Sequence, residues 1–419
     1  MSIEYLGLSS INGPLIVLEG VQDAFYDEIV EFVVDGTERK IGRIVEIYED
    51  KAVIQVFEGS ENMSLKNTHT KLTGHPMEIA LSPPDILGRT FNGIGQPIDD
   101  LGPLVSTLKR DVNGLPLNPV RREYPRNYIR TGISAIDGLT TLIRGQKLPI
   151  FSGNGLPHDQ LAAQIVKQAS LGSDSDEKFA IVFAAMGVKH DVADFFRNTF
   201  EESGVADHVA MFLNLANDPV VERLITPKVA LTAAEYLAFE QNMHILVILT
   251  DMTSFAEAMR EVSSSKGEIP SRKGFPGYLY SELATIYERA GIVQGVNGSV
   301  TQLPILTMPN DDITHPIPDL TGYITEGQIV LDRPLHGQSI YPPINILPSL
   351  SRLMKDGIGE GFTREDHQDL ANQLFSAYAK VGDARNLASV IGEDELSPLD
   401  KKYLEFGIDF EQHYIGQGG

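Results

Sequence analysis

The chain has 419 residues, 42% of them hydrophobic and 22% charged, a composition typical of a soluble protein with several domains. It contains no cysteine, which excludes disulfide bonds and thiolate metal sites. Its net charge of -23 disfavours binding to nucleic acid. No apolar run is long enough to cross a bilayer and no secretory signal is visible, so we expect a cytoplasmic protein without direct membrane insertion.

Residues 1–73 predict a small β-barrel. Short runs of β-branched residues alternate here with glycine and acidic turn residues, a pattern typical of a compact antiparallel fold. The predicted strands are residues 14–19, 29–34, 41–47 and 52–57.

Residues 74–346 predict an α/β core. Buried strands alternate with helices, and this alternation indicates a parallel sheet with helices on both faces. The predicted strands are residues 148–151, 180–184, 209–213, 245–249 and 300–307. Residues 347–419 predict a helical domain, in which Ser397 is expected to cap a helix that begins with Pro398.

A glycine-rich turn joins the strand at 148–151 to an apolar-periodic helix at 160–166. Strand, glycine turn and helix together present backbone N–H groups to a phosphate. The loop residues that could contact nucleotide are Ser152, Gly153, Asn154 and Gly155. A working loop ends in Gly-Lys-Ser/Thr, but Leu156 and Pro157 follow Gly155 and supply neither a cation nor a metal ligand. We therefore expect weak nucleotide binding or none, although a simple tight turn explains the isolated segment equally well.

Two further parts of an ATPase site are missing from the sequence. Asp251 ends an apolar strand, as a magnesium-orienting aspartate does, but without a loop hydroxyl it is expected to cap or anchor the next segment. Val188 follows Gly187 at the place where a glutamate would activate water, and valine cannot do so. Asp159 at the start of the helix would repel a phosphate. We predict that the chain has no metal site and does not hydrolyse ATP in its own pocket.

Arg352 is the remaining candidate for chemistry. It lies between the α/β and helical regions, where a loop can face a neighbouring subunit. An arginine at such a place can stabilise charge on a γ-phosphate that another chain holds, an effect worth roughly 10³–10⁵ in rate. The residue pattern alone favours the alternative, a surface salt bridge.

Six longer stretches carry a resemblance to a known family: residues 128–137, 144–153, 212–219, 230–236, 276–280 and 312–328. With the loop form Ser-Gly-x-Gly-Leu-Pro-His, they make the chain similar, nearly from end to end, to the B subunit of V-type and archaeal A-type rotary ATPases. The catalytic A subunit of that family keeps the Gly-Lys-Thr ending, which this chain lacks.

The resemblance implies an N-terminal barrel, a RecA-like core with a degenerate P-loop and a C-terminal helical domain. It implies a non-catalytic, regulatory subunit in a ring of three A and three B subunits, which hydrolyses or synthesises ATP while H⁺ or Na⁺ is transported. Arg352 would act in trans as an arginine finger on ATP or ADP with Mg²⁺, held at the interface with the A subunit. Further partners would be the central rotor stalk and, through the N-terminal domain, the peripheral stalks, in a soluble head peripheral to the membrane.

The sequence departs from the family at two places. Residues 271–274 read Ser-Arg-Lys-Gly where the family commonly has Gly-Arg-Arg-Gly, and Lys273 cannot make the bidentate contacts of an arginine. The helical domain is short, so contacts with the rotor are expected to be weaker. Two other functions remain open: a self-sufficient ATPase motor, which needs the absent lysine and glutamate, and a nucleotide-sensing module that binds without catalysis.

Overall fold

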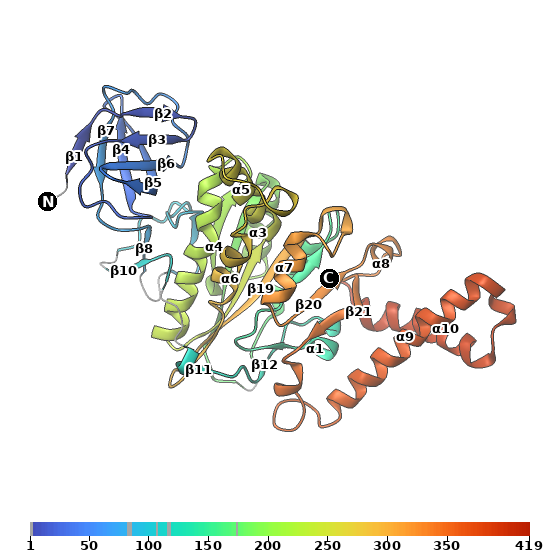
Figure 1. The fold of residues 1–419 in the computed structure, drawn as a ribbon. Coiled ribbons are helices and arrows are strands. Elements are labelled where there is room, and N and C mark those ends of the chain that lie inside the picture. The colour runs from blue at the N-terminus through green and yellow to red at the C-terminus, as the bar shows by residue number, and fades with distance from the viewer. Residues whose placement is uncertain (1–2, 82–85, 106–107, 115–118, 173–174) are drawn as a thin grey trace.

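The computed structural model describes residues 3–81, 86–105, 108–114, 119–172 and 175–419, and it has three parts along the chain (Figure 1). An N-terminal antiparallel sheet leads into a central α/β core, and a pair of helices follows at the C-terminal side. The predicted fold class is confirmed.

In the described part of the N-terminal region, seven antiparallel strands pair in the order β1-β7-β4-β5-β6-β3-β2 and curl around a core of their own. Alternate residues of β4 and β6 are fully buried, which is why β-branched side chains dominate these runs. The strands are β1 Glu4–Leu6, β2 Ser10–Asn12, β3 Leu15–Leu18, β4 Ile29–Val34, β5 Glu38–Tyr48, β6 Lys51–Val56 and β7 His69–Leu72.

The central sheet pairs in the order β21-β20-β14-β19-β17-β15-β16-β9, and all pairs from β20 to β9 are parallel. The strands β21 and β18 are antiparallel to their neighbours, and β11 extends β18. The strands are β9 Thr90–Asn92, β11 Arg122–Glu123, β14 Ile150–Ser152, β15 Phe179–Val188, β16 Val209–Leu215, β17 His244–Thr250, β18 Gly291–Val293, β19 Ser299–Thr307, β20 Gly327–Leu331 and β21 Ile344–Ser351. The strand β21 continues past residue 346, where the core was predicted to end. The domain boundaries at residues 73 and 346 stay predictions.

Helices cover both faces of this sheet. On β15, Ala180, Val182 and Ala184 pack into one apolar layer, whereas Ile181 and Phe183 pack into the other. One layer holds α4 Val220–Glu235, α5 Met252–Ser265, α6 Leu279–Tyr287 and α7 Pro316–Ile324. The other holds α1 Ser134–Leu139, α2 His158–Gln168, α3 His190–Glu202 and α8 Arg333–Gly337. Because the strands are buried on both sides, their sequences read as continuous apolar runs.

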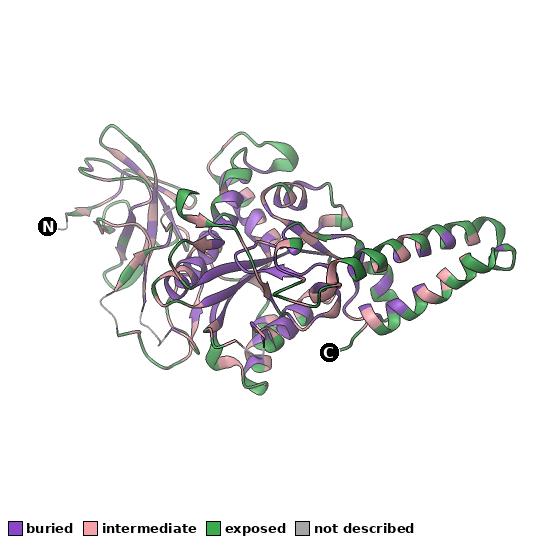
Figure 2. Cartoon of the chain, turned by 90° about the horizontal axis from the view of Figure 1, so that it is seen from below, coloured by how far each residue is buried: buried purple, intermediate pink, exposed green. Residues whose placement is uncertain are grey.

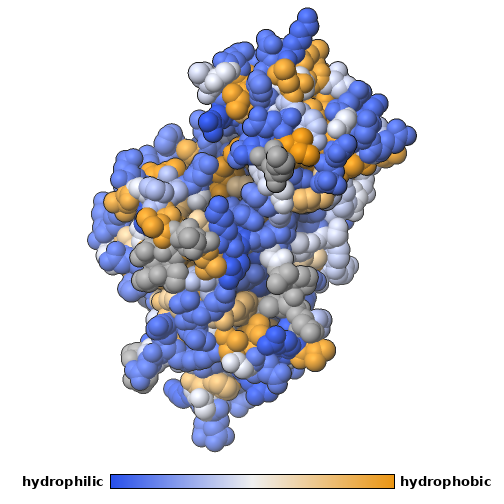
Figure 3. Space-filling model, turned by 90° about the vertical axis from the view of Figure 1, so that its left-hand side faces the viewer, coloured by the Kyte–Doolittle hydropathy of each residue, from blue (hydrophilic) through white to orange (hydrophobic). Residues whose placement is uncertain are grey.

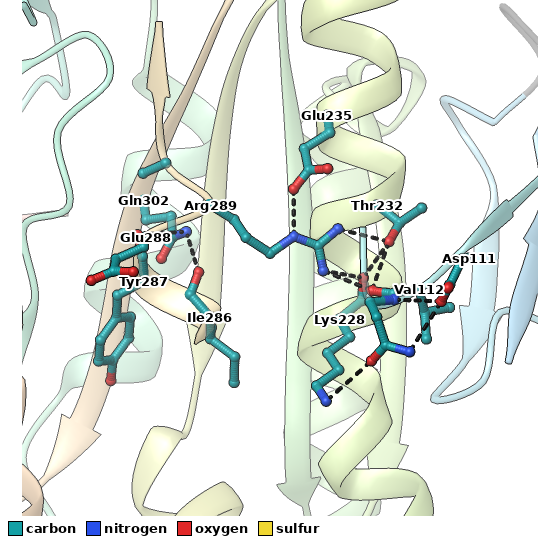
Figure 4. A network of polar contacts seen from close by, with 12 residues as sticks. Asp111, Val112, Lys228, Thr232, Glu235, Ile286, Tyr287, Glu288, Arg289 and Gln302 are labelled. Carbon is teal, nitrogen blue, oxygen red and sulfur yellow. Dashed lines mark hydrogen bonds and ion pairs between the residues drawn. The ribbon is translucent and has the colours of Figure 1, made fainter. Parts of the chain in front are cut away.

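The segment that connects the N-terminal sheet to the core is held by a buried arginine (Figure 4). Arg289, just after α6, bonds the Glu235 carboxylate and the Thr232 hydroxyl of α4 and the Val112 carbonyl of the connecting segment. Two small sheets complete this region, β8 Glu78–Ala80 with β10 Lys109–Asp111, and β12 Tyr128–Ile129 with β13 Leu142–Ile143.

The C-terminal helices α9 His367–Ile391 and α10 Pro398–Phe410 form a hairpin that extends away from the core and is exposed on most sides (Figure 2). The predicted cap is confirmed, since Ser397 Oγ accepts from Asp400 N at 3.1 Å. At the base of the hairpin, the rings of Phe410 and Tyr414 stack at 5.2 Å, and Tyr414 Oη donates to the Ser134 carbonyl of α1. Leu399, near the start of α10, is 61% exposed.

The surface on the N-terminal side is mostly hydrophilic, with small separate apolar patches (Figure 3). Scattered exposed apolar residues are normal for a folded protein. Among the described residues, no helix is long and apolar enough to cross a membrane.

Candidate functional site

The degenerate loop has the position of a phosphate-binding loop but is closed by its own side chains. It connects β14 to α2, and Ser152 Oγ lies 2.8 Å from Nδ1 of His158, the first residue of the helix. Leu156 is 6% exposed and packs into the core under α2. This bond engages the Ser152 hydroxyl and Nδ1 of His158 with each other inside the loop.

An ion pair covers the other side of this loop. Arg333, at the start of α8, donates from Nε and Nη2 to both carboxylate oxygens of Asp311 at 2.7 and 2.9 Å. Its Nη2 also donates to the Asn154 carbonyl at 2.9 Å. A Cβ on Gly153 would clash with Asp311 Oδ1, so any larger residue here would push this carboxylate away from the loop. The anion next to the loop is therefore a carboxylate of the chain itself.

Asp159, the second residue of α2, brings a further carboxyl group to the loop. Burial raises its pKa above the usual range, while the nearby His158 acts in the opposite direction. No lysine or arginine replaces the missing loop cation at this helix start, so the turn itself contributes its backbone N–H groups. The guanidinium of Arg333, which contacts the loop at the Asn154 carbonyl, is already paired with Asp311.

Asp251 is a structural residue, as predicted from the missing loop hydroxyl. It caps α5 by accepting from Thr253 N at 2.9 Å, and its other oxygen accepts from Thr307 Oγ1 at 2.9 Å. Burial raises the pKa of this carboxyl. Among the described residues, no cluster of three histidine or acidic side chains could hold a metal ion.

Arg223 lies beside Gly187, near the place where a catalytic base would be expected. Its Nε donates to Asn214 Oδ1 at 2.8 Å, and the same oxygen accepts from Gly187 N at 3.0 Å. A Cβ on Gly187 would lie 2.9 Å from the Arg223 guanidinium. A cation and an amide therefore stand where a water-activating carboxylate would be needed.

Arg352 and the loop lie at opposite ends of the parallel strands of the central sheet. The backbone N–H of Arg352 donates to the Glu326 carbonyl, just before β20 begins. Ser152, where the loop begins, lies level with Leu331, the last residue of the same strand. Five residues of strand correspond to roughly 16 Å. Nη1 donates to the Thr325 carbonyl at 2.9 Å and so points still farther from the loop. The arginine cannot serve the degenerate pocket of its own chain.

Arg352 is an exposed residue and lines a cavity of about 420 Å³ between β21 and α9. In the part of the chain that the structure describes, no carboxylate lies within ion-pair distance of the Arg352 guanidinium. The surface salt bridge that the residue pattern alone favoured is therefore not formed among these residues. Lys355 lines the same cavity and is also exposed.

The turn at residues 271–274 is a short 3₁₀ segment in which Arg272 contacts its own chain. Arg272 donates to Asp319 Oδ2 at 3.0 Å and to the Thr314 carbonyl at 2.6 Å. Lys273 has a φ of 55° and contributes its carbonyl, which accepts from Arg260 Nη1 at 3.0 Å. Its side chain has no part in these contacts.

Sequence reasoning missed Asp311, Arg333, Arg223 and His158. Asp311 and Arg333 follow β19 and β20, the two neighbours of β14, and the carboxyl ends of parallel strands meet at one edge of the sheet. Knowing the strand order would have placed both beside the loop, but alternation of strands and helices does not reveal that order.

Three family models together cover most of the chain. The ATP synthase alpha/beta family, nucleotide-binding domain, matches residues 132–351, and the beta-barrel domain of that family matches residues 8–74. The C-terminal domain of V and A type ATP synthase matches residues 356–419.

Over its 419 residues the chain is 65% identical to V-type ATP synthase beta chain 2 of Clostridium tetani, and the match covers 100% of this chain and 91% of the relative. The chain belongs to the B subunits of the ATP synthase alpha/beta family. Another member, the B subunit of the A-type ATP synthase of Aeropyrum pernix, is 57% identical over 415 residues, 99% of this chain and 89% of the relative. The solved structure of the ATP synthase subunit NeqB from Nanoarcheaum equitans is 42% identical, with a TM-score of 0.76 over 97% of this chain and 94% of that one.

Proposed function

We propose that the chain is the non-catalytic, regulatory subunit of a ring of three A and three B subunits, and that Arg352 completes the catalytic site of a neighbouring A subunit. The observation that carries this proposal is the position of Arg352. Arg352 is an exposed residue, its guanidinium lacks a carboxylate partner among the described residues, and it lies level with the amino-terminal end of β20, whereas the chain's own loop lies at the carboxyl end of β14. Such an arginine can stabilise phosphate charge only in another chain.

The residues described around the loop, at Gly187 and at Asp251 support the same function. The loop has neither cation nor metal ligand, and the Asp311 carboxylate lies directly beside Gly153. Arg223 and Asn214 occupy the surroundings of Gly187. ATP or ADP with Mg²⁺ would be bound by the A subunit at the shared interface, and none would be held tightly by the loop residues 152–155.

The exposed C-terminal hairpin supports a place in a larger assembly. Val390 is 81% exposed and Leu399 61%, and both lie near the turn between α9 and α10, where a partner could cover them. The central rotor stalk would contact this end, and peripheral stalks would contact the N-terminal sheet. The ring would form the cytoplasmic head of a complex that couples ATP synthesis or hydrolysis to H⁺ or Na⁺ transport.

Mixing the chain with a catalytic A subunit tests this function. We expect no ATP turnover and no saturable binding of Mg-ADP by the purified chain, and turnover that rises with added chain until the two subunits are equimolar. The A subunit alone is the control for background activity. ATP turnover by the purified chain would contradict the proposal, because it would require the cation and base that the chain lacks.

A further inference from the structure

A fully buried glutamine contacts the strand end that carries Arg352. Gln146 lies in the turn between β13 and β14 and is 0% exposed. Its Nε2 donates at 2.9 Å to Oγ of Ser351, the residue before Arg352. The same nitrogen donates at 3.3 Å to the Glu326 carbonyl, which also accepts from the backbone N–H of Arg352 at 2.9 Å. Both side-chain contacts of this nitrogen therefore end next to the arginine.

The glutamine is itself fixed to the core. Its Oε1 accepts from Ile143 N at 2.9 Å, and its backbone carbonyl accepts from Gln302 N of β19 at 2.8 Å. Ser351 Oγ in turn donates to the Thr141 carbonyl at 2.8 Å. A buried amide whose oxygen and nitrogen both have partners is held in one arrangement. Since β19 lies inside the central sheet, Gln146 connects the end of β21 to a rigid part of the molecule.

The direction of the Arg352 side chain depends on this strand end. Its Nη1 donates to the Thr325 carbonyl at 2.9 Å, and no carboxylate among the described residues lies within ion-pair distance of the guanidinium. A long side chain with so few contacts has many accessible rotamers, so the backbone from which it extends decides where it can reach. An arginine that acts on a phosphate must be held within about 0.5 Å of its productive position.

We propose that Gln146 is a positioning residue for Arg352, an inference that rests on the proposed function of this arginine. The amide of Gln146 holds the end of β21 against the turn between α7 and β20, so that the guanidinium extends toward the phosphate held by a neighbouring A subunit. Gln146 is fully buried and touches no substrate. A side chain without an N–H donor could not bond the Glu326 carbonyl and would leave this strand end less firmly held.

ATP turnover by rings assembled from a catalytic A subunit and the Gln146→Met chain tests this role. Methionine is similar in length but cannot donate a hydrogen bond. We expect kcat per assembled ring to fall about 10- to 100-fold with little change in KM, because the arginine acts in the transition state. Gln302→Met is the matched control, since Gln302 is also fully buried but its Nε2 donates to the Ile286 carbonyl of α6 (Figure 4). Its kcat should equal that of the wild type.

The double variant Gln146→Met with Arg352→Ala separates positioning from a general loss of structure. If Gln146 acts only through Arg352, the double variant turns over as slowly as Arg352→Ala alone. A further fall in the double variant would overturn the positioning role. So would full kcat in the Gln146→Met ring when the Arg352→Ala ring is slow. Full turnover in the Arg352→Ala ring would instead contradict the proposed function, and the positioning role with it.

Ser351→Ala decides the matter if size-exclusion chromatography shows that the Gln146→Met ring does not assemble. This variant removes the oxygen that accepts from Gln146 Nε2 and leaves the buried amide in place. We expect kcat to fall about tenfold, and we expect no further fall when Ser351→Ala is combined with Arg352→Ala. A Ser351→Ala ring with the kcat of the wild type would then overturn the proposal.

Discussion

At the scale of single residues, Asp251 has a structural role. Its carboxylate bonds Thr253 N and Thr307 Oγ1 in a buried place, with no metal-binding cluster among the described residues around it. Asp251→Ala removes these bonds and the longer one from Thr307 N, and should lower the free energy of unfolding by about 1–3 kcal/mol. Asp251→Asn should cost less, because its amide oxygen still caps α5.

Urea unfolding of the wild type and both Asp251 variants, each with and without Mg²⁺, measures these costs. We expect Mg²⁺ to leave all three midpoints unchanged. A midpoint that rises with Mg²⁺ in the wild type but not in Asp251→Asn would show that the aspartate still binds the metal.

Glu222, in the first turn of α4, should make stability depend on pH. Burial, together with Asp218 and Glu58, raises its pKa from 4.5 to about 7. The folded state therefore holds this proton more tightly than the unfolded state, so the contribution to stability is full below pH 4.5 and is lost as the pH rises through 7. Glu222→Gln should be more stable than the wild type at pH 8 by about 1–2 kcal/mol, after allowance for solvent screening.

Guanidinium unfolding of the wild type and Glu222→Gln at several values between pH 4.5 and pH 8 checks this dependence. The two proteins should be nearly equal at the acidic end and separate toward neutral pH. Parallel curves would show that Glu222 titrates at its ordinary pKa.

The residues differ in how far the sequence could predict them. The cap role of Asp251 follows from the missing loop hydroxyl, and the cap at Ser397 follows from the Ser-Pro-x-Asp pattern. The ion pair of Asp311 with Arg333 could not be predicted, because it depends on β14 lying between β19 and β20. Pairing order is a long-range property, and local residue patterns do not contain it.

At the scale of elements, the Arg289 cluster joins α4, α6 and the connecting segment (Figure 4). Arg289 and Glu235 are largely buried, so a neutral residue at 289 leaves an unpaired charge. Arg289→Met should lower the free energy of unfolding by about 2–4 kcal/mol. Arg110→Met is the matched control, because Arg110 pairs with Glu240 at the surface and should cost below about 1 kcal/mol.

Chemical unfolding of both arginine variants and of the double variant Arg289→Met with Glu235→Gln separates charge from packing. The double variant should recover part of the loss, because no charge is left buried without a partner. Similar losses for Arg289→Met and Arg110→Met would show that the cluster contributes no more than a surface pair.

The sequence predicted which segments form strands and helices better than it predicted where each of them begins and ends. The five predicted core strands are all present. Four of them contain the whole predicted range and extend beyond it, for example β15 at Phe179–Val188, whereas β14 is shifted to Ile150–Ser152. Apolar runs mark where a strand is buried, but hydrogen bonding continues into less apolar residues at its ends. The N-terminal region has more strands than the four runs suggested, because β1, β2 and β7 have three or four residues each and little apolar pattern.

At the scale of the whole molecule, the central sheet places the degenerate loop and Arg352 at opposite ends of its parallel strands. The degenerate loop lies at the carboxyl end of β14, and Arg352 lies at the other end of the same sheet, level with Glu326. In a ring of alternating subunits, each B subunit would have two interfaces. This chain would contribute Arg352 to one kind of interface and the degenerate loop to the other. The proposed regulatory role rests on this separation.

The most direct test of this account is the ATP turnover of a ring assembled from a catalytic A subunit and this chain carrying Arg352→Ala. Size-exclusion chromatography first shows that the ring forms, and Arg364→Ala, which removes an exposed arginine paired with Asp366, is the matched control. We expect Arg352→Ala to lower turnover about 10³-fold or more while Arg364→Ala leaves it unchanged. Full turnover in an assembled Arg352→Ala ring would contradict the account.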